Sequence, residues 1–268
     1  MDRMTPWRAV QFTDLHLYHS PEGGLLGLNT QQSFQAVLAH FKNHHWPVDV
    51  VLATGDLAQD GSVAAYKSLR ALLLPLDLPV YWIPGNHDNP AAMAQALTGG
   101  LISAQRQVLL PPWQIILLDS TQPQQVSGCL TGNQLAFLTE CITTHPEHYA
   151  LVCLHHHPLS MGSAWLERIG LVNGADFLKL VRQYSQVRGV VWGHIHQDYT
   201  RQDGELLLMA TPSTCIQFKP RTPDFALDTV LPGYRWLELH SDGRIVTGVE
   251  RLTSLGPDQY INMTAQGY

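Results

Sequence analysis

Five apolar runs of this chain each end in polar residues of the kinds that bind metal ions. Each run reads as a buried β-strand, and the polar segments follow in this order along the chain: Asp14-Leu15-His16, Gly55-Asp56, Gly85-Asn86-His87-Asp88, His155-His156-His157 and Gly193-His194-Ile195-His196. The carboxyl ends of parallel strands meet at one edge of a sheet, so we expect these segments to share one cleft. Aspartate, asparagine and histidine together form a mixed nitrogen and oxygen site for two transition-metal ions.

Three of these segments have the residue types or spacing that a two-metal site requires. Asp14 and His16 are two residues apart, so in an extended chain they point to one side and can bind the same ion. The two oxygens of Asp56 can bridge two cations. His194 and His196 can reach two ions that lie side by side. Taken alone, each segment is also typical of an ordinary polar turn, and only their joint occurrence makes the prediction strong.

Two segments leave a choice between roles. Three consecutive histidines point in different directions, so they cannot all bind one metal ion. We predict that His155, the nearest to the strand, is the ligand, and that the next two contact substrate or support the site. In the other segment Asn86 offers a carbonyl oxygen to a metal ion. His87 can then reach a substrate, and Asp88 can hold the His87 ring in one tautomer.

The composition argues against several classes of protein. The chain has 268 residues and a formal net charge of -6, which argues against a protein that grips nucleic-acid phosphates. It contains no run of about 18 apolar residues, so no membrane helix is predicted. The N-terminus lacks the apolar core of a signal peptide, so we expect a cytoplasmic protein. Four widely spaced cysteines are expected to be reduced. No feature indicates an oligomeric state.

Predicted strands and helices alternate along most of the chain. Strands are expected at 7–12, 48–53, 80–83, 108–110, 113–118, 149–154 and 187–192, and helices at 30–43, 62–74, 131–143 and 175–184. Further strands are expected at 205–209, 234–239 and 245–249. The alternation predicts an α/β protein with helices covering a sheet. The final strands predict antiparallel additions, as a second sheet or an edge. We expect a single domain over 1–268.

A long loop near the C-terminus is a candidate for substrate recognition. Residues 211–232 contain four prolines, and long loops inside compact domains are often functional. Phe218 offers a flat apolar surface to a base, and Ser213, Thr214 and Gln217 offer polar contacts. The alternative is that Phe218 packs the loop onto the body of the protein.

The ordered set D-x-H, G-D, G-N-H-D, H and G-H-x-H, over residues 8–200, resembles the calcineurin-like metallophosphoesterase superfamily. The resemblance implies a four-layer α/β/β/α sandwich, with mixed sheets flanked by helices and a two-metal centre at one edge. It also implies ligands for two ions. One ion would be held by Asp14, His16, Asp56 and His196, and the other by Asp56, Asn86, His155 and His194.

Further stretches are similar to the class III cyclic nucleotide phosphodiesterases. They are FTDLH at 12–16, HHHPL at 155–159, GHIHQ at 193–197, ATPSTCIQFKP at 210–220 and PGY at 232–234. The similarity implies that two divalent ions, Fe²⁺ and/or Mn²⁺, hold a bridging hydroxide. That hydroxide would attack phosphorus in line with the ribose 3'-oxygen and convert 3',5'-cyclic AMP into 5'-AMP.

We also expect particular roles for individual residues. His87 would be the general acid or transition-state donor, and substrate contacts would come from Asn86, His87, His196 and Phe218. One alternative is a broader phosphodiesterase acting on 2',3'-cyclic nucleotides or glycerophosphodiesters. A second is a sensor that binds a nucleotide or a metal without turnover, although the presence of His87 beside a full ligand set argues against it. The expected partner is a small cyclic nucleotide, with no nucleic acid and no membrane.

Overall fold

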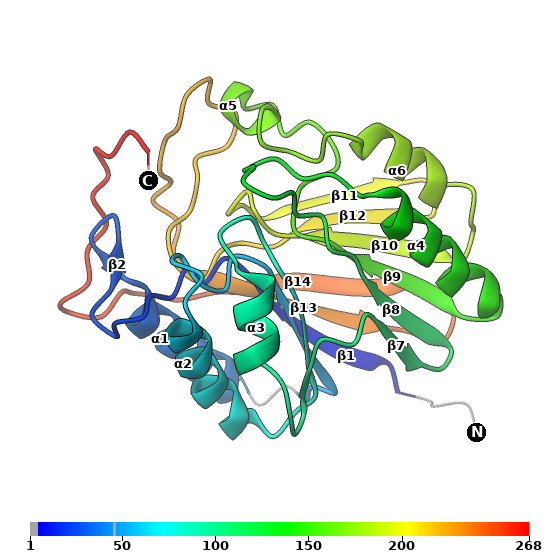
Figure 1. The fold of residues 1–268 in the computed structure, drawn as a ribbon, viewed down its shortest axis with the longest axis horizontal. Helices are drawn as coiled ribbons and strands as arrows, with labels where there is room; N and C mark the ends of the chain where they lie inside the picture. The colour runs from blue at the N-terminus through cyan, green and yellow to red at the C-terminus, as the bar shows by residue number, and fades with distance from the viewer. Residues whose placement is uncertain (1–4, 45–46, 268) are drawn as a thin grey trace.

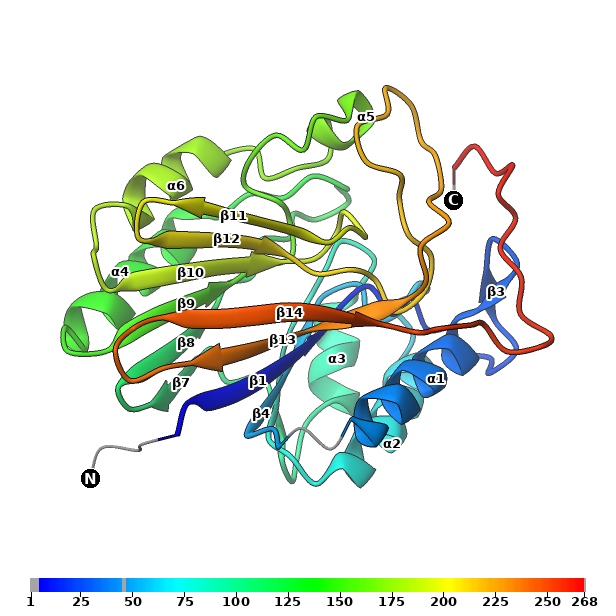
Figure 2. The same cartoon turned by 180° about the vertical axis from the view of Figure 1, so that it is seen from behind.

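Two six-stranded sheets face each other in the computed structural model, which describes residues 5–44 and 47–267 (Figures 1 and 2). Residues 1–4, on which part of the signal-peptide prediction rests, lie outside the described residues. The first sheet has the order β14 (Ile245–Arg251), β13 (Gly233–Leu239), β1 (Trp7–Phe12), β4 (Val50–Thr54), β5 (Val80–Ile83) and β6 (Ile102–Ser103). The second has the order β11 (Tyr199–Asp203), β12 (Leu206–Ala210), β10 (Val187–Trp192), β9 (Tyr149–Cys153), β8 (Trp113–Leu117) and β7 (Gln107–Leu110).

Helices cover the outer face of each sheet (Figure 1). The first sheet carries α1 (Thr30–Asn43), α2 (Val63–Leu73) with the 3₁₀ turn η1 (Leu74–Leu76), and α3 (Pro90–Ala96). The second carries α4 (Gly132–Thr144) and α6 (Gly174–Val181). A third apolar cluster fills the space between the sheets. This arrangement confirms the predicted four-layer sandwich. Among the described helices, none combines the length and apolar character needed to cross a membrane.

Local sequence signals explain why the main helices begin where they do. The side chain of Ser62 accepts a hydrogen bond from Ala65 N at 3.1 Å, and Thr131 caps α4 in the same way. Such caps satisfy amide groups that have no partner inside the helix. Helix α1 buries Phe34 and Phe41 on its inner face, at the spacing predicted for an amphipathic helix.

The structure corrects the prediction that the final strands are all antiparallel additions. β12 pairs in parallel with β10, whereas β13 and β14 extend the first sheet antiparallel to β1. The reason is β11, which the sequence analysis did not predict because its side chains are largely polar and exposed. β11 reverses the chain and pairs antiparallel with β12, so β12 returns in the direction of β10. Five other short elements were also missed: α3, β6, α5 (Ala164–Glu167), and the two strands of a hairpin, β2 (Gly24–Leu25) and β3 (Leu28–Asn29).

Candidate metal centre

The five polar segments leave the two sheets at the same end of the sandwich. β1, β4 and β5 run parallel to one another in the first sheet, and β9 and β10 run parallel in the second. Hydrogen bonds join the segments: Asp14 N donates to Gly55 O at 3.0 Å, and His194 N donates to the Asp14 carboxylate at 3.0 Å. The segments therefore meet in one cleft as expected, but that cleft lies between two sheets and not along the edge of one.

Five of the predicted ligands have a backbone conformation that side chains rarely adopt. The φ angles of Asp14, His16, Asp56, His194 and His196 are 54°, 49°, 48°, 68° and 47°. A residue other than glycine held in this region costs about 1–3 kcal/mol, and such residues concentrate at functional sites. The strain is independent of the sequence pattern, and it falls on the same positions.

Glycines next to the ligands are required by close packing. A Cβ atom on Gly55, whose φ is +93°, would lie 2.3 Å from His155 Nδ1. A Cβ on Gly193 would lie 2.1 Å from Thr13 Oγ1 and 2.5 Å from Asp14 Oδ2. Both contacts are far shorter than van der Waals distances, so only glycine lets the strand ends approach this closely.

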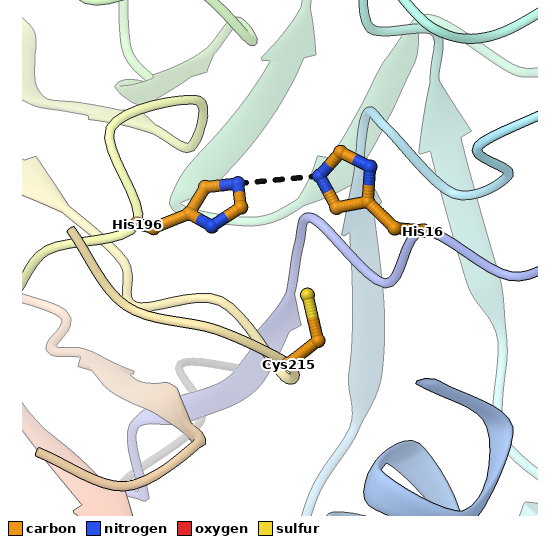
Figure 3. A group of neighbouring side chains, drawn as sticks. All are labelled: His16, His196 and Cys215. Atoms are coloured by element: carbon orange, nitrogen blue, oxygen red, sulfur yellow. Dashed lines mark hydrogen bonds between the residues drawn. The ribbon is translucent and has the colours of Figure 1, made fainter. Parts of the chain in front are cut away.

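The side chains of the first group of predicted ligands lie close together, and Figure 3 shows its two histidines, His16 and His196, pointing toward each other. His16 Nε2 lies 3.2 Å from His196 Nε2, His196 Nε2 lies 3.3 Å from Asp14 Oδ1, and His16 Nε2 lies 3.9 Å from Asp56 Oδ2. All four side chains are buried. A single cation placed among these atoms would be in reach of two imidazole nitrogens and two carboxylates.

Hydrogen bonds on the other ring nitrogens hold these two histidines in place. His16 Nδ1 lies 2.5 Å from Gln59 Oε1, and His196 Nδ1 lies 2.8 Å from Ile216 O. Because each partner is an oxygen acceptor, each Nδ1 carries the proton and each Nε2 presents its lone pair to the centre. Metal-binding histidines are usually oriented in this way.

Cys215 lies beside this group, as Figure 3 shows. Its thiol donates to the backbone oxygen of Asp14 at 3.4 Å and is 3.1 Å from Ser213 Oγ. Burial raises the pKa of the Cys215 thiol to about 12. These contacts place Cys215 beneath the Asp14 loop. All four cysteines are free, as the sequence predicted.

The second group of predicted ligands lies around His155. His155 Nε2 is 3.2 Å from Asp56 Oδ2 and 4.0 Å from Asp14 Oδ1, while its Nδ1 donates to Thr54 O at 2.9 Å. His194 donates from Nε2 to the carbonyl of Ile169 at 3.0 Å, which leaves Nδ1 as its lone-pair nitrogen. Asp56 thus lies next to ligands of both groups, as a bridging carboxylate requires.

Asn86 provides an independent sign that the cleft suits a cation. Its side-chain oxygen is buried and has no hydrogen-bond partner among the described residues. A buried polar atom without a partner costs free energy, and a metal ion would satisfy it. The Asn86 oxygen therefore fits the role of a neutral ligand.

The structure favours His155 over the two histidines that follow it. Both ring nitrogens of His156 are engaged, Nδ1 with Ser120 Oγ at 2.8 Å and Nε2 with Val126 O at 3.1 Å. His157 is also buried, and its ring stacks on His194 with centroids 5.7 Å apart. Both of these histidines pack against predicted ligands, and neither is among the residues that line the cavity beside the site.

Charge inside the cleft favours a bound cation. Burial alone would raise the pKa of Asp56, but His155 and His87 hold it well below its usual range. In turn, burial alone would lower the pKa of His155, but Asp56 and Asp14 raise it to about 9. The two carboxylates are therefore negative and attract positive charge, and a bound metal ion would take the place of the His155 proton.

Asp88 has a different role from the predicted one. Its carboxylate accepts hydrogen bonds from the backbone N–H groups of Leu57, Ala58 and Gly85 at 2.9–3.1 Å and from Tyr66 Oη at 2.8 Å. These four bonds fill the acceptor capacity of a carboxylate. Asp88 therefore ties the loops after β4 and β5 together, and this contribution to the site is indirect.

His87 lies at the border of the metal centre and an open cavity. Its backbone N–H donates to Asp56 Oδ1 at 2.9 Å, and its ring packs edge-on against His16 with centroids 5.1 Å apart. The cavity that it lines has a volume of about 450 Å³, within the usual range for small-molecule sites. His87 is thus placed to meet a substrate bound in that cavity.

Phe218 does not face the cavity, which corrects the prediction of a substrate contact. Its ring is 1% exposed and stacks on His196, with centroids 4.0 Å apart and planes 9° apart. Ser213 and Gln217 are also buried, and they donate hydrogen bonds to the backbone oxygens of Asp14 and Ser213. The loop therefore packs against a predicted metal ligand.

The aromatic residues at the cavity are Trp165 and Phe225, which the sequence analysis missed. Trp165 belongs to α5, in the loop between β9 and α6, and Phe225 belongs to the 211–232 loop. The sequence signal that could have identified them is the presence of an aromatic residue in each of these two loops, which both follow strands that end at the site. Figure 1 shows α5 and the 211–232 loop side by side above the open edge of the sandwich, and Thr222 N donates to Ser163 Oγ at 3.1 Å.

Comparison with known proteins places this site in a family. The sequence pattern of the calcineurin-like phosphoesterases matches residues 8–198. The chain belongs to that family. Calcineurin-like phosphoesterases use a centre of two divalent metal ions, and the clusters of histidine and aspartate described above lie where such a centre is expected.

Two bacterial relatives are similar over nearly their whole length. The 3',5'-cyclic adenosine monophosphate phosphodiesterase CpdA of Vibrio vulnificus is 45% identical, with 92% of this chain and 90% of the relative covered. The protein of the same description from Pseudomonas aeruginosa is 43% identical, with 91% and 89% covered. Among solved structures, a dimetal phosphatase from Danio rerio has a TM-score of 0.59 at 16% identity, over 91% of this chain and 98% of that one. That last likeness concerns the fold alone.

Proposed function

We propose that this protein hydrolyses 3',5'-cyclic AMP to 5'-AMP. The observation that carries the proposal is the convergence of all seven predicted ligand side chains in one cleft beside a cavity of about 450 Å³. The relatives described as cyclic AMP phosphodiesterases align over about nine-tenths of the chain. The choice of cyclic AMP as the substrate is based on these relatives.

We propose that two divalent ions, Fe²⁺ and/or Mn²⁺, bind in the cleft. The first would be held by Asp14, His16, Asp56 and His196, and the second by Asp56, Asn86, His155 and His194. Nitrogen and oxygen donors in this mixture suit these metals. When bound, such a pair neutralises the charge of a phosphate group and supplies a nucleophile at neutral pH.

The residues of the chain then orient the substrate and move a proton. His87 donates a proton to the ribose 3'-oxygen as the P–O3' bond breaks, because it borders the cavity without being needed as a ligand. Asn86 and His196 also contact the phosphate from the metal centre. Asp88 keeps His87 in position by holding the Gly85 turn against the loop after β4.

The whole chain acts as one domain in this proposal. β13 and β14 belong to the same sheet as β1 and β4, and the loop at 211–232 packs on a predicted ligand through Phe218. Residues 211–268 would therefore contribute C-terminal strands and a loop on the substrate side.

A substrate panel with product identification tests the function. Purified protein supplied with Mn²⁺ is assayed with cyclic AMP, cyclic GMP, 2',3'-cyclic AMP, glycerophosphodiesters and bis(4-nitrophenyl) phosphate. We expect the highest kcat/KM for cyclic AMP, with 5'-AMP as the product. Higher kcat/KM for a glycerophosphodiester or for 2',3'-cyclic AMP would identify a broader phosphodiesterase. Binding without turnover of any substrate would identify a sensor.

A further inference from the structure

One part of the cavity beside the metal centre consists of aromatic and cationic side chains with no role in holding metal. The lining includes Asn86 and His194 from the metal centre, and it also includes Trp165, Arg168 and Phe225. We call these last three residues the recognition wall. A ligand that fills the cavity touches both the metal centre and this wall.

The two rings of the recognition wall are the accessible part of a larger aromatic cluster. Trp165 packs edge-on against Phe225 at 5.3 Å between centroids, and both pack edge-on against Phe218 at 5.1 and 5.4 Å. Phe218 is buried, whereas Trp165 and Phe225 are partly exposed. Since Phe218 stacks on His196, the two outer rings have a fixed position relative to the metal centre.

Arg168 brings a positive charge to the same wall. Its side chain is exposed, and among the described residues its guanidinium has no hydrogen bond or ion pair. The next residue, Ile169, accepts a hydrogen bond from His194 Nε2 at 3.0 Å. The backbone that carries Arg168 is therefore attached directly to a predicted metal ligand, and the guanidinium is available to an anion.

We propose that the recognition wall binds the nucleotide, with Trp165 and Phe225 contacting the purine base and Arg168 pairing with the anionic phosphate. Aromatic side chains stack on bases because both surfaces are flat and apolar. The planar guanidinium matches the geometry of phosphate oxygens. This inference rests on the proposed function, because it assigns the residues that select a nucleotide at that metal centre.

The test compares ligands with and without a base. Hydrolysis of bis(4-nitrophenyl) phosphate by the metal-loaded protein is inhibited with 5'-AMP or with inorganic phosphate, and KM for cyclic AMP is measured in parallel. For Trp165→Leu and for Phe225→Leu, we expect KM for cyclic AMP and the inhibition constant of AMP to rise at least about fivefold. The inhibition constant of phosphate, which has no base, should not change. Trp165→Phe should restore most AMP affinity because it keeps a flat ring.

Arg168 is tested with the same pair of inhibitors. Arg168→Ala should raise the inhibition constants of both AMP and phosphate, since both ligands carry an anionic phosphate group. Arg168→Lys should recover part of the lost affinity. Metal content and Tm are measured for every variant, and both should match the unchanged protein. This control separates a lost ligand contact from a disturbed fold, because Trp165 also packs against Phe218.

Two results would overturn the recognition wall. The first is unchanged AMP inhibition in both leucine variants at full metal content. The second is an equal loss of AMP and phosphate binding in those variants, which would mean that the rings only support the metal centre. Failure of the unchanged protein to hydrolyse cyclic AMP would instead reject the proposed function. The comparison of AMP with phosphate would still test the wall.

Discussion

At the scale of single residues, the site depends on which atom each side chain leaves available. His155 and His156 are neighbours with the same chemistry, but hydrogen bonds to protein groups occupy both nitrogens of His156 and only Nδ1 of His155. Asp56 is the residue shared by both groups of predicted ligands. These differences predict unequal effects of substitutions that look equivalent in the sequence.

Asp56→Ala should abolish binding of both metal ions, because a bridging carboxylate serves each of them. Metal content after loading with Mn²⁺ should fall from two ions per chain to nearly none, and cyclic AMP hydrolysis should be lost. Asp60→Ala is the matched control, since Asp60 lies in the same loop but bonds to His19. Two tightly bound ions in the Asp56 variant would show that the ligand assignment is wrong.

His87→Ala should keep the metal ions and lose catalytic rate. We expect kcat for cyclic AMP to fall about 10²–10⁴-fold, the usual contribution of a general acid or base. The loss should be smaller for bis(4-nitrophenyl) phosphate, whose leaving group needs no proton. His19→Ala, in an exposed loop, serves as the control. An equal loss on both substrates would assign His87 an electrostatic role and not proton transfer.

At the scale of elements, loops join the metal centre to the substrate cavity. The 211–232 loop places Phe218 against His196 and Phe225 at the cavity. The short helix α5 and the residues after it place Trp165 at the cavity and the Ile169 carbonyl against His194. Each loop therefore supports a ligand with one residue and faces the cavity with another.

Phe218→Ala should act through stability and metal binding, since the ring is buried behind His196. Truncating a buried phenylalanine costs about 3–5 kcal/mol, so we expect Tm to fall by roughly 10 °C. Hydrolysis of cyclic AMP and of the nitrophenyl diester should fall in parallel. Phe137→Ala, on α4 and away from the site, should keep its specific activity. A selective loss of cyclic AMP turnover at unchanged Tm would restore Phe218 as a substrate contact.

At the scale of the whole molecule, the metal centre joins the two sheets. Asp14, His16, Asp56 and Asn86 follow strands of the first sheet, and His155, His194 and His196 follow strands of the second. A metal ion bound between them would add a link across the open edge of the sandwich. Because the unfolded chain lacks such a site, metal binding should stabilise the folded protein.

Metal loading should therefore raise Tm. A ligand present at a hundredfold excess over its Kd stabilises a protein by about 2.7 kcal/mol, which corresponds to roughly 5–10 °C for a chain of this size. Calorimetry of the chelator-treated protein, before and after addition of Mn²⁺, measures the shift. Asp56→Ala should show almost none of it. The same shift in that variant would place the stabilising ion elsewhere.

The sequence by itself determined the fold class and the set of polar segments at the strand ends. Both are local properties: apolar runs specify strands, helical spacing specifies helices, and the residue after a strand lies at the edge of its sheet. The tertiary structure decided which side chains face the cavity. Phe218 looks as suitable as Phe225 in the sequence, but only packing between distant loops buries the former against His196 and leaves the latter accessible. Likewise, the carboxylate of Asp88 is taken by amide groups of a loop about 30 residues earlier in the chain, and such long-range competition for a hydrogen bond leaves no periodic signal.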